Sequence, residues 1–525
     1  MAEFKIKDGV LVKYNGAGGE VVVPDGVIAI GERAFEQNEK ITSVTLPDGV
    51  TSVGKQAFSG CSKLKTIILP DSVEEIGMFA FWSCHALEEV TLPKKLGKIE
   101  YGTFDSCWAL RSIIIPDGVT EIGGSAFEFC WKLSSVVFPP SLTQILSSAF
   151  SNCKALTQIE LPERVTEVGA YAFFGCERLS KFIAHAPSLK IDDTAFTWDK
   201  RISNVDVPIS AIGAIPKEKL HCLTVRGDGK IAARAFADSS VSVLVLDGEI
   251  EIGEAAFSGC KYLESVMLSP KIKVIGAQAF SRCSKLADVT LPNALEVLGS
   301  MAFSECETLT AVVIPDTVKS LGRWVFSGCK NLTSVVLPVG LTALPFGLFQ
   351  GCCKLAAVAL PKTVRVIEEA AFSGCQALTA VEIPECVTTI EKYAFSGCQA
   401  LTSVSLPQGV TSIEFGLFQG CKKLSFLTIP DGVKNIDGTA FEKTAVERIV
   451  IPAAVKRISC TAFAECSSLR EVEFEERNGW YIASSCSKKR IDMDVSNPER
   501  NAAHLLDFDT SGIDVFYYCF WCRDA

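Results

Sequence analysis

Apolar and polar positions recur along this chain with a period of 23 residues. In one copy, Leu64, Ile67 and Leu69 are apolar, and their alternation predicts a half-buried strand. The proline that follows ends the strand, because proline cannot donate to a sheet ladder. A second short extended segment is predicted around an earlier pair, Val50 and Val53, whose side chains should point inward. The chain therefore reads as many short strands separated by turns.

Phenylalanine marks the same point of each repeat. Nineteen phenylalanines belong to the series, and fifteen of them follow an alanine that is small enough to let the ring enter the core. A fixed period of about 20 to 50 residues indicates a solenoid, in which each repeat buries its apolar face against its neighbours. The expected fold is a β-rich solenoid of about 19–20 coils, with a long parallel sheet, end caps and short turns or 3-10 segments around each ring. The series is Phe35, Phe58, Phe81, Phe104, Phe127, Phe150, Phe173, Phe196, Phe236, Phe257, Phe280, Phe303, Phe326, Phe349, Phe372, Phe395, Phe418, Phe441 and Phe463.

A cysteine follows most of these phenylalanines three residues later. Fifteen of the 22 cysteines occupy this position. A cysteine at one register of successive coils predicts a buried column of small side chains. Disulfides between all neighbouring rungs are impossible, because each sulfur pairs only once, so free thiols are expected, as in a reducing compartment. Representative members of the two structural ladders are Phe58, Phe81, Phe104, Phe280, Phe303, Cys61, Cys84, Cys107, Cys283 and Cys306.

The repeats are bounded by two caps and interrupted once. The first segment should form a hairpin that turns at Asn15 and Gly16. The interruption lacks the phenylalanine, and we expect a variant coil with a short helix over 217–220. In the last segment, Asn497 and Pro498 should begin a helix as N-cap and first helical residue. The expected division is 1–23 as N-terminal cap hairpin, 24–201 as repeats, 202–240 as an irregular variant repeat, 241–474 as repeats and 475–525 as C-terminal cap.

The repeat unit resembles a known family. The pattern C-x-x-L-x-x-[VI]-x-[LI]-P-x-x-V-x-x-[IV]-G-x-x-A-F over about residues 24–474 is similar to the BspA-like leucine-rich repeat proteins of gut and oral bacteria and some protozoa. The segment 207–220 also looks like a spacer unit of such proteins. The resemblance implies a surface antigen or adhesin that binds host proteins or other microbes. The chain departs from that pattern because it shows no secretory signal, sorting tail or cell-wall module.

Charge and hydropathy narrow the classes of partner. The formal net charge is −10, and the most basic cluster is 488–490, which argues against nucleic acid as a partner. No apolar run approaches the ~20 residues of a membrane helix, so membrane insertion is not expected. The start of the chain has no apolar segment of a signal peptide, which predicts a cytoplasmic protein. The resemblance to surface proteins leaves a cell-surface or secreted location open as the alternative.

The outer face of the predicted sheet is the first candidate binding surface. The outward positions of its strands are small or β-branched and carry little charge, which suits a protein partner. The alternative is that β-branched residues simply fit a pleated sheet. The candidate contacts on this face are Ile68, Ile114 and Val137.

A cluster of aromatic residues is the second candidate surface. Trp108 and Trp131 each follow a ladder cysteine, so they should lie at one register on adjacent coils, with His85 one coil earlier. Exposed tryptophans on neighbouring repeats are typical anchors for a partner protein, or stacking platforms for a glycan. Alternatively, the rings cover the edge of the core. The candidate residues are Phe79, Trp82, His85, Tyr101, Trp108 and Trp131.

Catalytic chemistry has little support in the sequence. The pair Cys519 and Cys522 has the spacing of a redox or zinc motif, but too few residues follow it for the helix that would lower a thiolate pKa. A zinc site needs two more ligands, and the nearest candidates, Cys486 and His504, have unconvincing spacing. The four histidines lie in no nucleophile, phosphate or metal motif. We therefore expect a non-enzymatic recognition scaffold without cofactor or metal, monomeric, that binds a protein partner. The alternative is a surface adhesin or antigen that binds host proteins or glycans.

Overall fold

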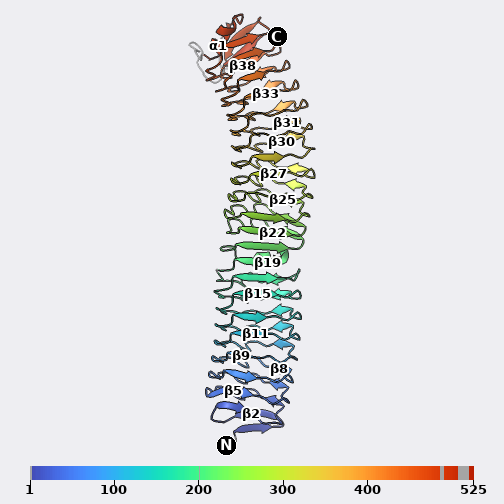
Figure 1. Cartoon of the computed structure of the whole chain (residues 1–525), viewed down its shortest axis with the longest axis vertical. Coiled ribbons are helices and arrows are strands. Elements are labelled where there is room, and N and C mark those ends of the chain that lie inside the picture. Colours follow the sequence, from blue (N-terminus) through green and yellow to red (C-terminus); the bar gives the residue numbers. More distant parts are fainter. Residues whose placement is uncertain (1–2, 200, 485–489, 507–518, 525) are drawn as a thin grey trace. The chain divides into compact units, whose positions relative to one another are not determined.

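The computed structural model describes residues 3–199, 201–484, 490–506 and 519–524. Its contacts divide the chain into two units. The N-terminal unit comprises 1–228 and 243–247, and the C-terminal unit comprises 229–242 and 248–525. Each is a parallel β-solenoid, which confirms the predicted fold class (Figure 1).

Parallel strands form the first column of the N-terminal unit. Strands of successive regular coils align 23 residues apart, as Ser43, Thr66 and Glu89 do. Hydrogen bonding divides the column into three groups, because no ladder joins β9 to β11 or β13 to β15 in this fully described part of the chain. The strands are β3 (Gly19–Val22), β5 (Ile41–Thr45), β7 (Thr66–Ile68) and β9 (Glu89–Val90); β11 (Ser112–Ile114) and β13 (Ser135–Val137); and β15 (Gln158–Leu161), β17 (Lys181–Ala184), β19 (Asn204–Pro208), β20 (Cys222–Arg226) and β22 (Val243–Asp247).

A second column consists mainly of two-residue strands. In most of them the second residue is buried, as Val53 and Ile76 are, and the first faces outward. The strands are β4 (Ala29–Ile30), β6 (Ser52–Val53), β8 (Glu75–Ile76), β10 (Lys98–Ile99), β12 (Glu121–Ile122), β14 (Gln144–Ile145), β16 (Glu167–Val168) and β18 (Lys190–Ile191).

A third column is made of turns around the repeat phenylalanine. In one coil the N–H groups of Gln56 and Phe58 donate to carbonyls of the next coil at 3.0 and 2.8 Å. The N–H groups of the alternate residues, Ala57 and Ser59, donate within the turn at 3.2 and 3.1 Å. Nearly every turn holds two left-handed residues, two positions before and two after the phenylalanine, such as Gln56 (φ 55°) and Gly60 (φ 73°). The turn therefore satisfies its backbone groups without forming a helix.

The two predicted ladders are present. From Phe35 to Phe196 the rings stack at centroid distances of 4.7–5.7 Å, and Tyr14 extends the column at its start, 5.1 Å from Phe35. Each ladder cysteine is buried and free, and its thiol donates to the carbonyl of a phenylalanine one coil back, as Cys84 does to Phe58 at 3.2 Å. The cysteine column therefore links coils by hydrogen bonds rather than by disulfides.

The start of the chain forms a hairpin whose turn differs from the prediction. Strands β1 (Phe4–Lys7) and β2 (Val10–Tyr14) pair antiparallel around Asp8 and Gly9, both left-handed at φ 51° and 76°. The turn predicted at Asn15–Gly16 is wrong, because Phe4 pairs with Tyr14 and so places the reversal between the two strands. Strand β2 then pairs in parallel with β4 and joins the solenoid.

The interruption is a shortened coil that also differs in detail from the prediction. Strands β19 and β20 align only 18 residues apart, Asn204 opposite Cys222. The segment between them contains a 3-10 helix, η1 (Ile209–Ala214), which packs near β18 and β19. The helix predicted over 217–220 is wrong, because residues 218 and 219 form a turn and their neighbours 217 and 220 have no regular secondary structure. Proline at 208 and 216 brackets η1 and fixes the backbone there.

The C-terminal unit repeats the same coil. Its phenylalanines stack from Phe236 to Phe463 at 5.0–6.2 Å. The first column contains β24 (Ser265–Leu268), β27 (Ala311–Val313), β29 (Ser334–Val336), β33 (Ser403–Ser405), β35 (Phe426–Thr428), β37 (Arg448–Ile451) and β39 (Glu471–Phe474). The second column contains β21 (Gly229–Ile231), β23 (Ile250–Ile252), β25 (Val274–Ile275), β26 (Val297–Leu298), β28 (Ser320–Leu321), β30 (Ala343–Leu344), β31 (Val366–Ile367), β32 (Thr389–Ile390), β34 (Ser412–Ile413), β36 (Asn435–Ile436) and β38 (Arg457–Ser459).

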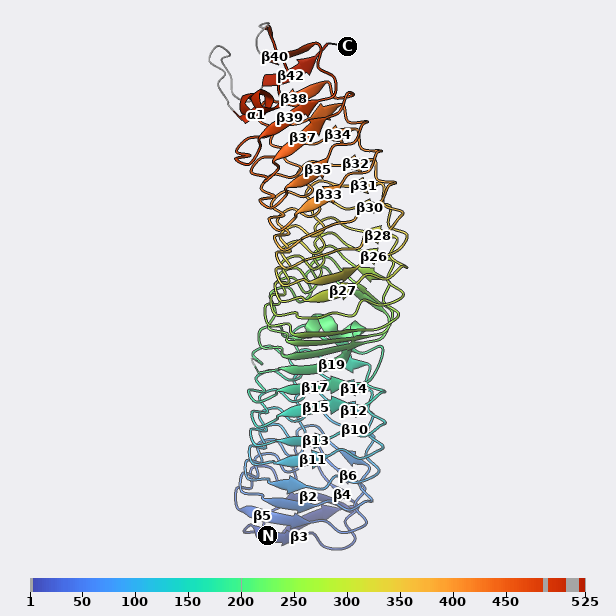
Figure 2. The same ribbon diagram turned by 45° about the horizontal axis from the view of Figure 1, so that its top comes forward.

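Antiparallel strands and one helix cover the last coils of this unit (Figure 2). Strand β42 (Cys519–Arg523) pairs with β38 and with β40 (Trp480–Ser484), which also pairs with β41 (Arg490–Asp492). Helix α1 (Pro498–Leu506) packs on β39, and the side chain of Asn497 accepts the N–H of Arg500 at 2.9 Å, which confirms Asn497 as its N-cap. Trp521 is buried in this cap beside Phe474, at 6.0 Å between ring centroids. The predicted C-terminal segment also includes 485–489 and 507–518, which lie outside the described residues.

Candidate functional site

A stack of three rings is the most distinctive surface feature of the N-terminal unit. His85, Trp108 and Trp131 lie on turns of three successive coils, one residue after their ladder cysteines. The His85 and Trp108 centroids are 3.6 Å apart with an interplanar angle of 14°, and Trp108 and Trp131 are 4.7 Å apart at 8°. Burial against Trp108 lowers the pKa of His85, so this imidazole is neutral at pH 7. Trp131 stays 42% exposed.

A second aromatic group lies on the turns that hold the repeat phenylalanines. Phe79 meets Trp82 and Tyr101 edge to face, at centroid distances of 6.4 and 5.3 Å. Its ring lies over Gly102, where an added Cβ would be 2.5 Å from the ring carbons. The missing side chain at this position thus makes room for a ring of the preceding coil. The predicted cluster therefore consists of two groups: the ring stack (His85, Trp108, Trp131) and the turn group (Phe79, Trp82, Tyr101).

The C-terminal unit uses the same turn arrangement twice. Trp324 lies over Gly347, and Tyr393 over Gly416, with the added Cβ again 2.4–2.5 Å from ring atoms. In each case the residue before the glycine is a second ring that contacts the first, at 4.5 Å for Trp324 and Phe346. Because this ring-on-glycine contact recurs, it is part of how these turns pack and does not by itself mark a binding site.

A half-buried carboxyl group anchors the turn group. Asp105 accepts a hydrogen bond from the Ser106 hydroxyl at 2.8 Å. Burial raises the pKa of Asp105 to about 6, opposed by hydrogen bonds from Ser106 and Trp82. Trp82 is 37% exposed, so its indole is held by the acid while part of the ring faces solvent.

The three predicted sheet contacts all face solvent. Ile68, Ile114 and Val137 are 62%, 70% and 52% exposed. Ile114 and Val137 are direct partners on β11 and β13, whereas Ile68 lies on β7 in the preceding sheet. The structure therefore brings two of the three together and leaves Ile68 two coils away.

The repeat identifies the family. A model of the BspA type leucine-rich repeat region, six copies long, matches residues 14–133, 120–219, 229–355, 342–470 and 388–491. The chain belongs to this family. Members form repeat scaffolds typical of protein binding and are generally not enzymes.

Solved leucine-rich repeat proteins resemble this BspA-type chain in sequence. A leucine-rich cell surface protein of Faecalibacterium prausnitzii is 26% identical over 76% of this chain and 92% of its own, with a TM-score of 0.34. A leucine-rich repeat protein of Bacteroides ovatus is 28% identical over 64% and 93%, with a TM-score of 0.41. The leucine-rich repeat protein of T. pallidum is 33% identical over 34% and 86%, with a TM-score of 0.32. No curated protein matches the chain significantly. Because all three TM-scores are below 0.5, the superpositions add nothing to the placement of a site.

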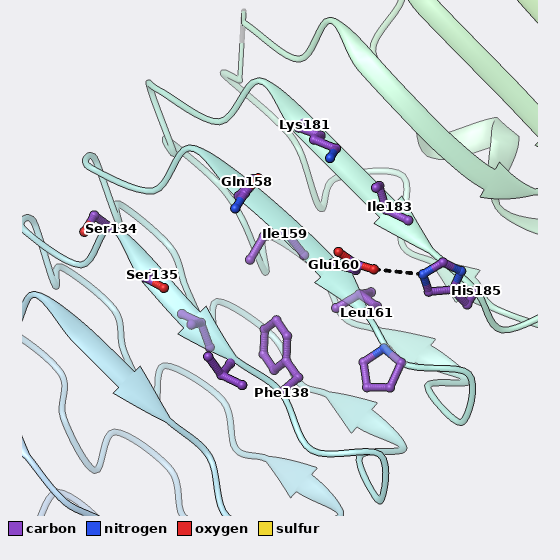
Figure 3. Close-up of a pocket in the computed structure, with 13 residues that line it drawn as sticks. Ser134, Ser135, Phe138, Gln158, Ile159, Glu160, Leu161, Lys181, Ile183 and His185 are labelled. Carbon is purple, nitrogen blue, oxygen red and sulfur yellow. Dashed lines mark hydrogen bonds and ion pairs between the residues drawn. The ribbon is translucent and has the colours of Figure 1, made fainter.

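A groove of about 460 Å³ opens where the first column is interrupted, between β13 and β15 (Figure 3). Phe138 occupies the position that Leu161 fills in the next coil, and its larger ring packs edge-on against Phe150 at 5.8 Å. Val136 beside it is only half-buried, whereas the equivalent Ile159 is 2% exposed. The oversized ring therefore coincides with the lost ladder and the opened surface.

Charged side chains border one end of this groove. His185, after β17, hydrogen-bonds Glu160 of β15 at 3.1 Å, as the dashed line in Figure 3 marks. Its other ring nitrogen is 3.3 Å from a guanidinium nitrogen of Arg226, which also pairs with Asp206. If Arg226 donates to Nδ1 of His185, then Nε2 carries the proton that Glu160 accepts. These contacts tie four successive strands together by side chains.

Several surface features were not found by sequence reasoning. Trp198 is 72% exposed and lies 6.3 Å from Phe174 between ring centroids. The sequence does indicate this position, because Trp198, like Phe129, lies two residues after a repeat phenylalanine, where the turn is left-handed. The grooves could not be found, because they depend on which ladder hydrogen bonds fail to form.

The candidate redox or zinc residues near the C-terminal end are not brought together in the part of the chain that the structure describes. Cys522 is half-buried on β42, the side chain of Cys519 and the whole of Cys486 lie outside the described residues, and His504 contacts Arg500. In the described part of the chain, no three His, Cys, Asp or Glu side chains are grouped as metal ligands. Among the described helices, none has the length and apolar character needed to cross a bilayer.

Proposed function

We propose that this chain is a non-enzymatic recognition scaffold that binds a protein partner through the aromatic surface of its N-terminal unit. The ring stack of His85, Trp108 and Trp131 carries the proposal. Large aromatic rings held rigidly at a surface lose little conformational freedom when they bind, and tryptophan is enriched among the residues that dominate protein interfaces. The turn group of Phe79, Trp82 and Tyr101, and the sheet residues Ile68, Ile114 and Val137, would extend the contact.

The geometry of the stack favours a protein over a glycan. Sugars bind aromatic side chains through the open ring face, but both faces of Trp108 are covered by His85 and Trp131. Solvent therefore reaches the central ring, Trp108, at its edges. Edges suit edge-to-face contacts with aromatic and aliphatic side chains of a protein.

A comparison of variants tests the proposal. Wild-type chain, the double variant Trp108→Ala/Trp131→Ala and the control Trp198→Ala are used to capture proteins from host and bacterial extracts, and each captured protein is then purified and titrated. Trp198→Ala removes an exposed ring of the same unit outside the stack. The double variant should weaken binding by about 2 kcal/mol or more, as expected for interface anchors, and the control should not. Equal affinity of all three chains would refute the aromatic site.

A surface adhesin or antigen is a more specific form of the same proposal. Membership of the BspA-type family favours it, and a leucine-rich cell surface protein is among the similar solved structures. Protease treatment of intact source cells should then release peptides of the repeats. If lysed cells yield these peptides and intact cells do not, the surface role is excluded while protein binding can still hold. A glycan array that stays empty with wild-type chain would exclude the glycan alternative.

A further inference from the structure

A second groove lies in the C-terminal unit, where the first column is again interrupted. It has a volume of about 690 Å³ and lies between β35 and β37, two fully described strands that share no ladder. The labels in Figure 2 show β35, β37 and β39 following one another along this unit. The interruption falls where one repeat is a residue short, with Phe441 and Phe463 only 22 residues apart. The groove therefore coincides with the altered spacing.

An exposed phenylalanine forms the apolar part of the groove. Phe426 is 68% exposed on β35, directly opposite Ser403 of β33. Val450 of β37 adds a second apolar side chain, 40% exposed. In the preceding regular coils of this unit the register of Phe426 holds serine, alanine or aspartate: Ser265, Asp288, Ala311, Ser334, Ala357, Ala380 and Ser403. A ring at this position leaves its surface open to a ligand.

The charges that line the groove are predominantly negative. Asp431, Glu447 and Glu475 line it, against a single cation, Arg448. That guanidinium is already paired with Glu471 at 2.6 Å. Glu475 is held in place because its carboxylate accepts the N–H of Ala453 at 2.9 Å. The groove therefore offers carboxylates to a ligand and has its own positive charge satisfied.

We propose that this groove binds a cationic, extended peptide segment of a partner protein, with an arginine side chain over Phe426. An aromatic ring attracts a guanidinium through its π face, and carboxylates take its N–H donors in charge-assisted hydrogen bonds. An aliphatic residue beside the arginine would contact Val450. The site lies in the other unit from the ring stack, so it does not depend on the function proposed above.

Fluorescence anisotropy with the full chain tests the proposal. The probe is a short fluorescein-labelled peptide with the order Arg-Leu-Arg between glycines, compared with the same peptide carrying citrulline, which keeps the shape of arginine and loses its charge. The arginine peptide should bind at least about tenfold more tightly than the citrulline peptide, a difference of roughly 1.4 kcal/mol. Its affinity should fall as salt is raised, because exposed charges are screened. No binding of the arginine peptide, or equal binding of both peptides, would overturn the proposal.

Matched variants separate the groove from the net negative charge of the whole chain. Phe426→Ser places the residue of the neighbouring strand at this position and should weaken binding about fivefold. Asp431→Asn with Glu447→Gln should weaken it about tenfold. Val336→Ser, which removes another exposed apolar residue of the same unit, and Glu89→Gln, which removes an exposed carboxylate of the other unit, should leave it unchanged. Equal losses in these controls would show non-specific attraction and reject the site.

Sedimentation velocity distinguishes the other possible occupant, a second copy of this chain. The wild-type chain should sediment as the same species as the Phe426→Ser variant. Self-association that disappears in the variant would assign the groove to a contact between copies, and the cationic-peptide proposal would then be wrong.

Discussion

Asp199 is the side chain whose replacement should reveal most about how the ladder stabilises the N-terminal unit. It lies three residues after Phe196, at the position that Cys176 and five earlier cysteines occupy in preceding coils. It is 4% exposed, and neither carboxyl oxygen has a hydrogen-bond partner among the described residues. Burial raises the pKa of Asp199 to about 8, and the nearby backbone of Cys176 opposes this rise. The folded unit therefore holds this side chain as the neutral acid at pH 7.

The raised pKa makes stability depend on pH in a defined direction. In the unfolded chain the carboxyl ionises near pH 4. The contribution of Asp199 is therefore most favourable below about pH 4 and is lost progressively as the pH rises toward 8, the folded-state value. At pH 7, about three units above the unfolded-state pKa, ionisation of Asp199 favours the unfolded chain by about 4 kcal/mol, at 1.36 kcal/mol per unit. This is an upper limit, since relaxation around a buried charge reduces it.

Two substitutions should recover this free energy. Asp199→Asn removes the ionisation at nearly constant size. Asp199→Cys restores the ladder residue, whose thiol would reach the carbonyl of Phe173 as Cys176 reaches that of Phe150 at 3.2 Å. Both should stabilise the N-terminal unit by up to about 4 kcal/mol at pH 7 and by clearly less at pH 5. The control Asp193→Asn, an exposed carboxyl of the same coil, should change little at either pH.

Urea titrations at pH 5 and pH 8, followed by a hydrogen-exchange pulse at one fixed pH and mass spectrometry, give the measurement. Peptides from 173–199 report the coil that holds Asp199, and peptides from 395–421 report an unaltered part of the other unit. A gain in Asp199→Asn that is equal at the two pH values would refute the reasoning, because it would arise from packing and not from ionisation. No gain at pH 8 would show that the carboxyl is hydrated and ionised.

Three further predictions concern the ladders and turns. Phe104→Ala removes a ring that stacks between Phe81 and Phe127 at 5.3 and 5.4 Å, and it should lower the free energy of unfolding by about 3–5 kcal/mol. Hydrogen-exchange protection should be lost first in peptides of 81–127, and uniform loss across the unit would contradict nearest-neighbour stability. Gly102→Ala should lower the Tm, because Gly102 has φ 62° and the new Cβ would clash with the Phe79 ring. In the control Gly97→Ala the new Cβ enters open space, so the Tm should stay nearly unchanged, and equal Tm values of the two variants would contradict this prediction. Burial raises the pKa of the ladder thiol Cys61 to about 12, so the buried ladder cysteines should resist iodoacetamide at pH 8. The half-buried Cys353 and Cys386 should react, which peptide mass spectrometry measures, and alkylation of both classes at one rate would refute the closed ladder.

The ladders could be predicted because every coil repeats one environment. Because the sequence period of 23 residues is also the length of one coil, Phe58 and Phe81 are neighbours in space. The same period places the phenylalanine ladder and the cysteine ladder. The same logic placed His85, Trp108 and Trp131 in one stack. Register follows from the repeat, so contacts between equivalent residues need no further information.

Features that differ between coils could not be predicted in this way. The left-handed residue two positions after each phenylalanine is glycine at Gly60 but serine at Ser83, so composition hides a conformation that the turn imposes. Glycine at the bend has a different cause from glycine in the turn, because Gly54 has no positive φ. A Cβ at Gly54 would be 2.7 Å from backbone atoms of the preceding coil. The hairpin turn required knowing that Phe4 pairs with Tyr14, since Asp8–Gly9 and Asn15–Gly16 have equal turn chemistry.

In a repeat fold, a coil that carries an unusual residue at one repeat position shows what that position normally requires. Asp199 replaces a thiol that donates to a carbonyl, and in the described part of the chain its two buried oxygens have no hydrogen-bond partner. Phe138 replaces a smaller aliphatic residue and coincides with a lost ladder, and Phe426 replaces a small side chain and exposes a ring. Each departure is surrounded by coils that keep the usual residue, so its cost and its effect on the surface remain local. The grooves beside Phe138 and Phe426 thus coincide with a single larger side chain and a single-residue change in spacing, and both open on the strand side of a coil. A solenoid of this kind can therefore acquire a binding surface at one coil without altering the stacking of the others.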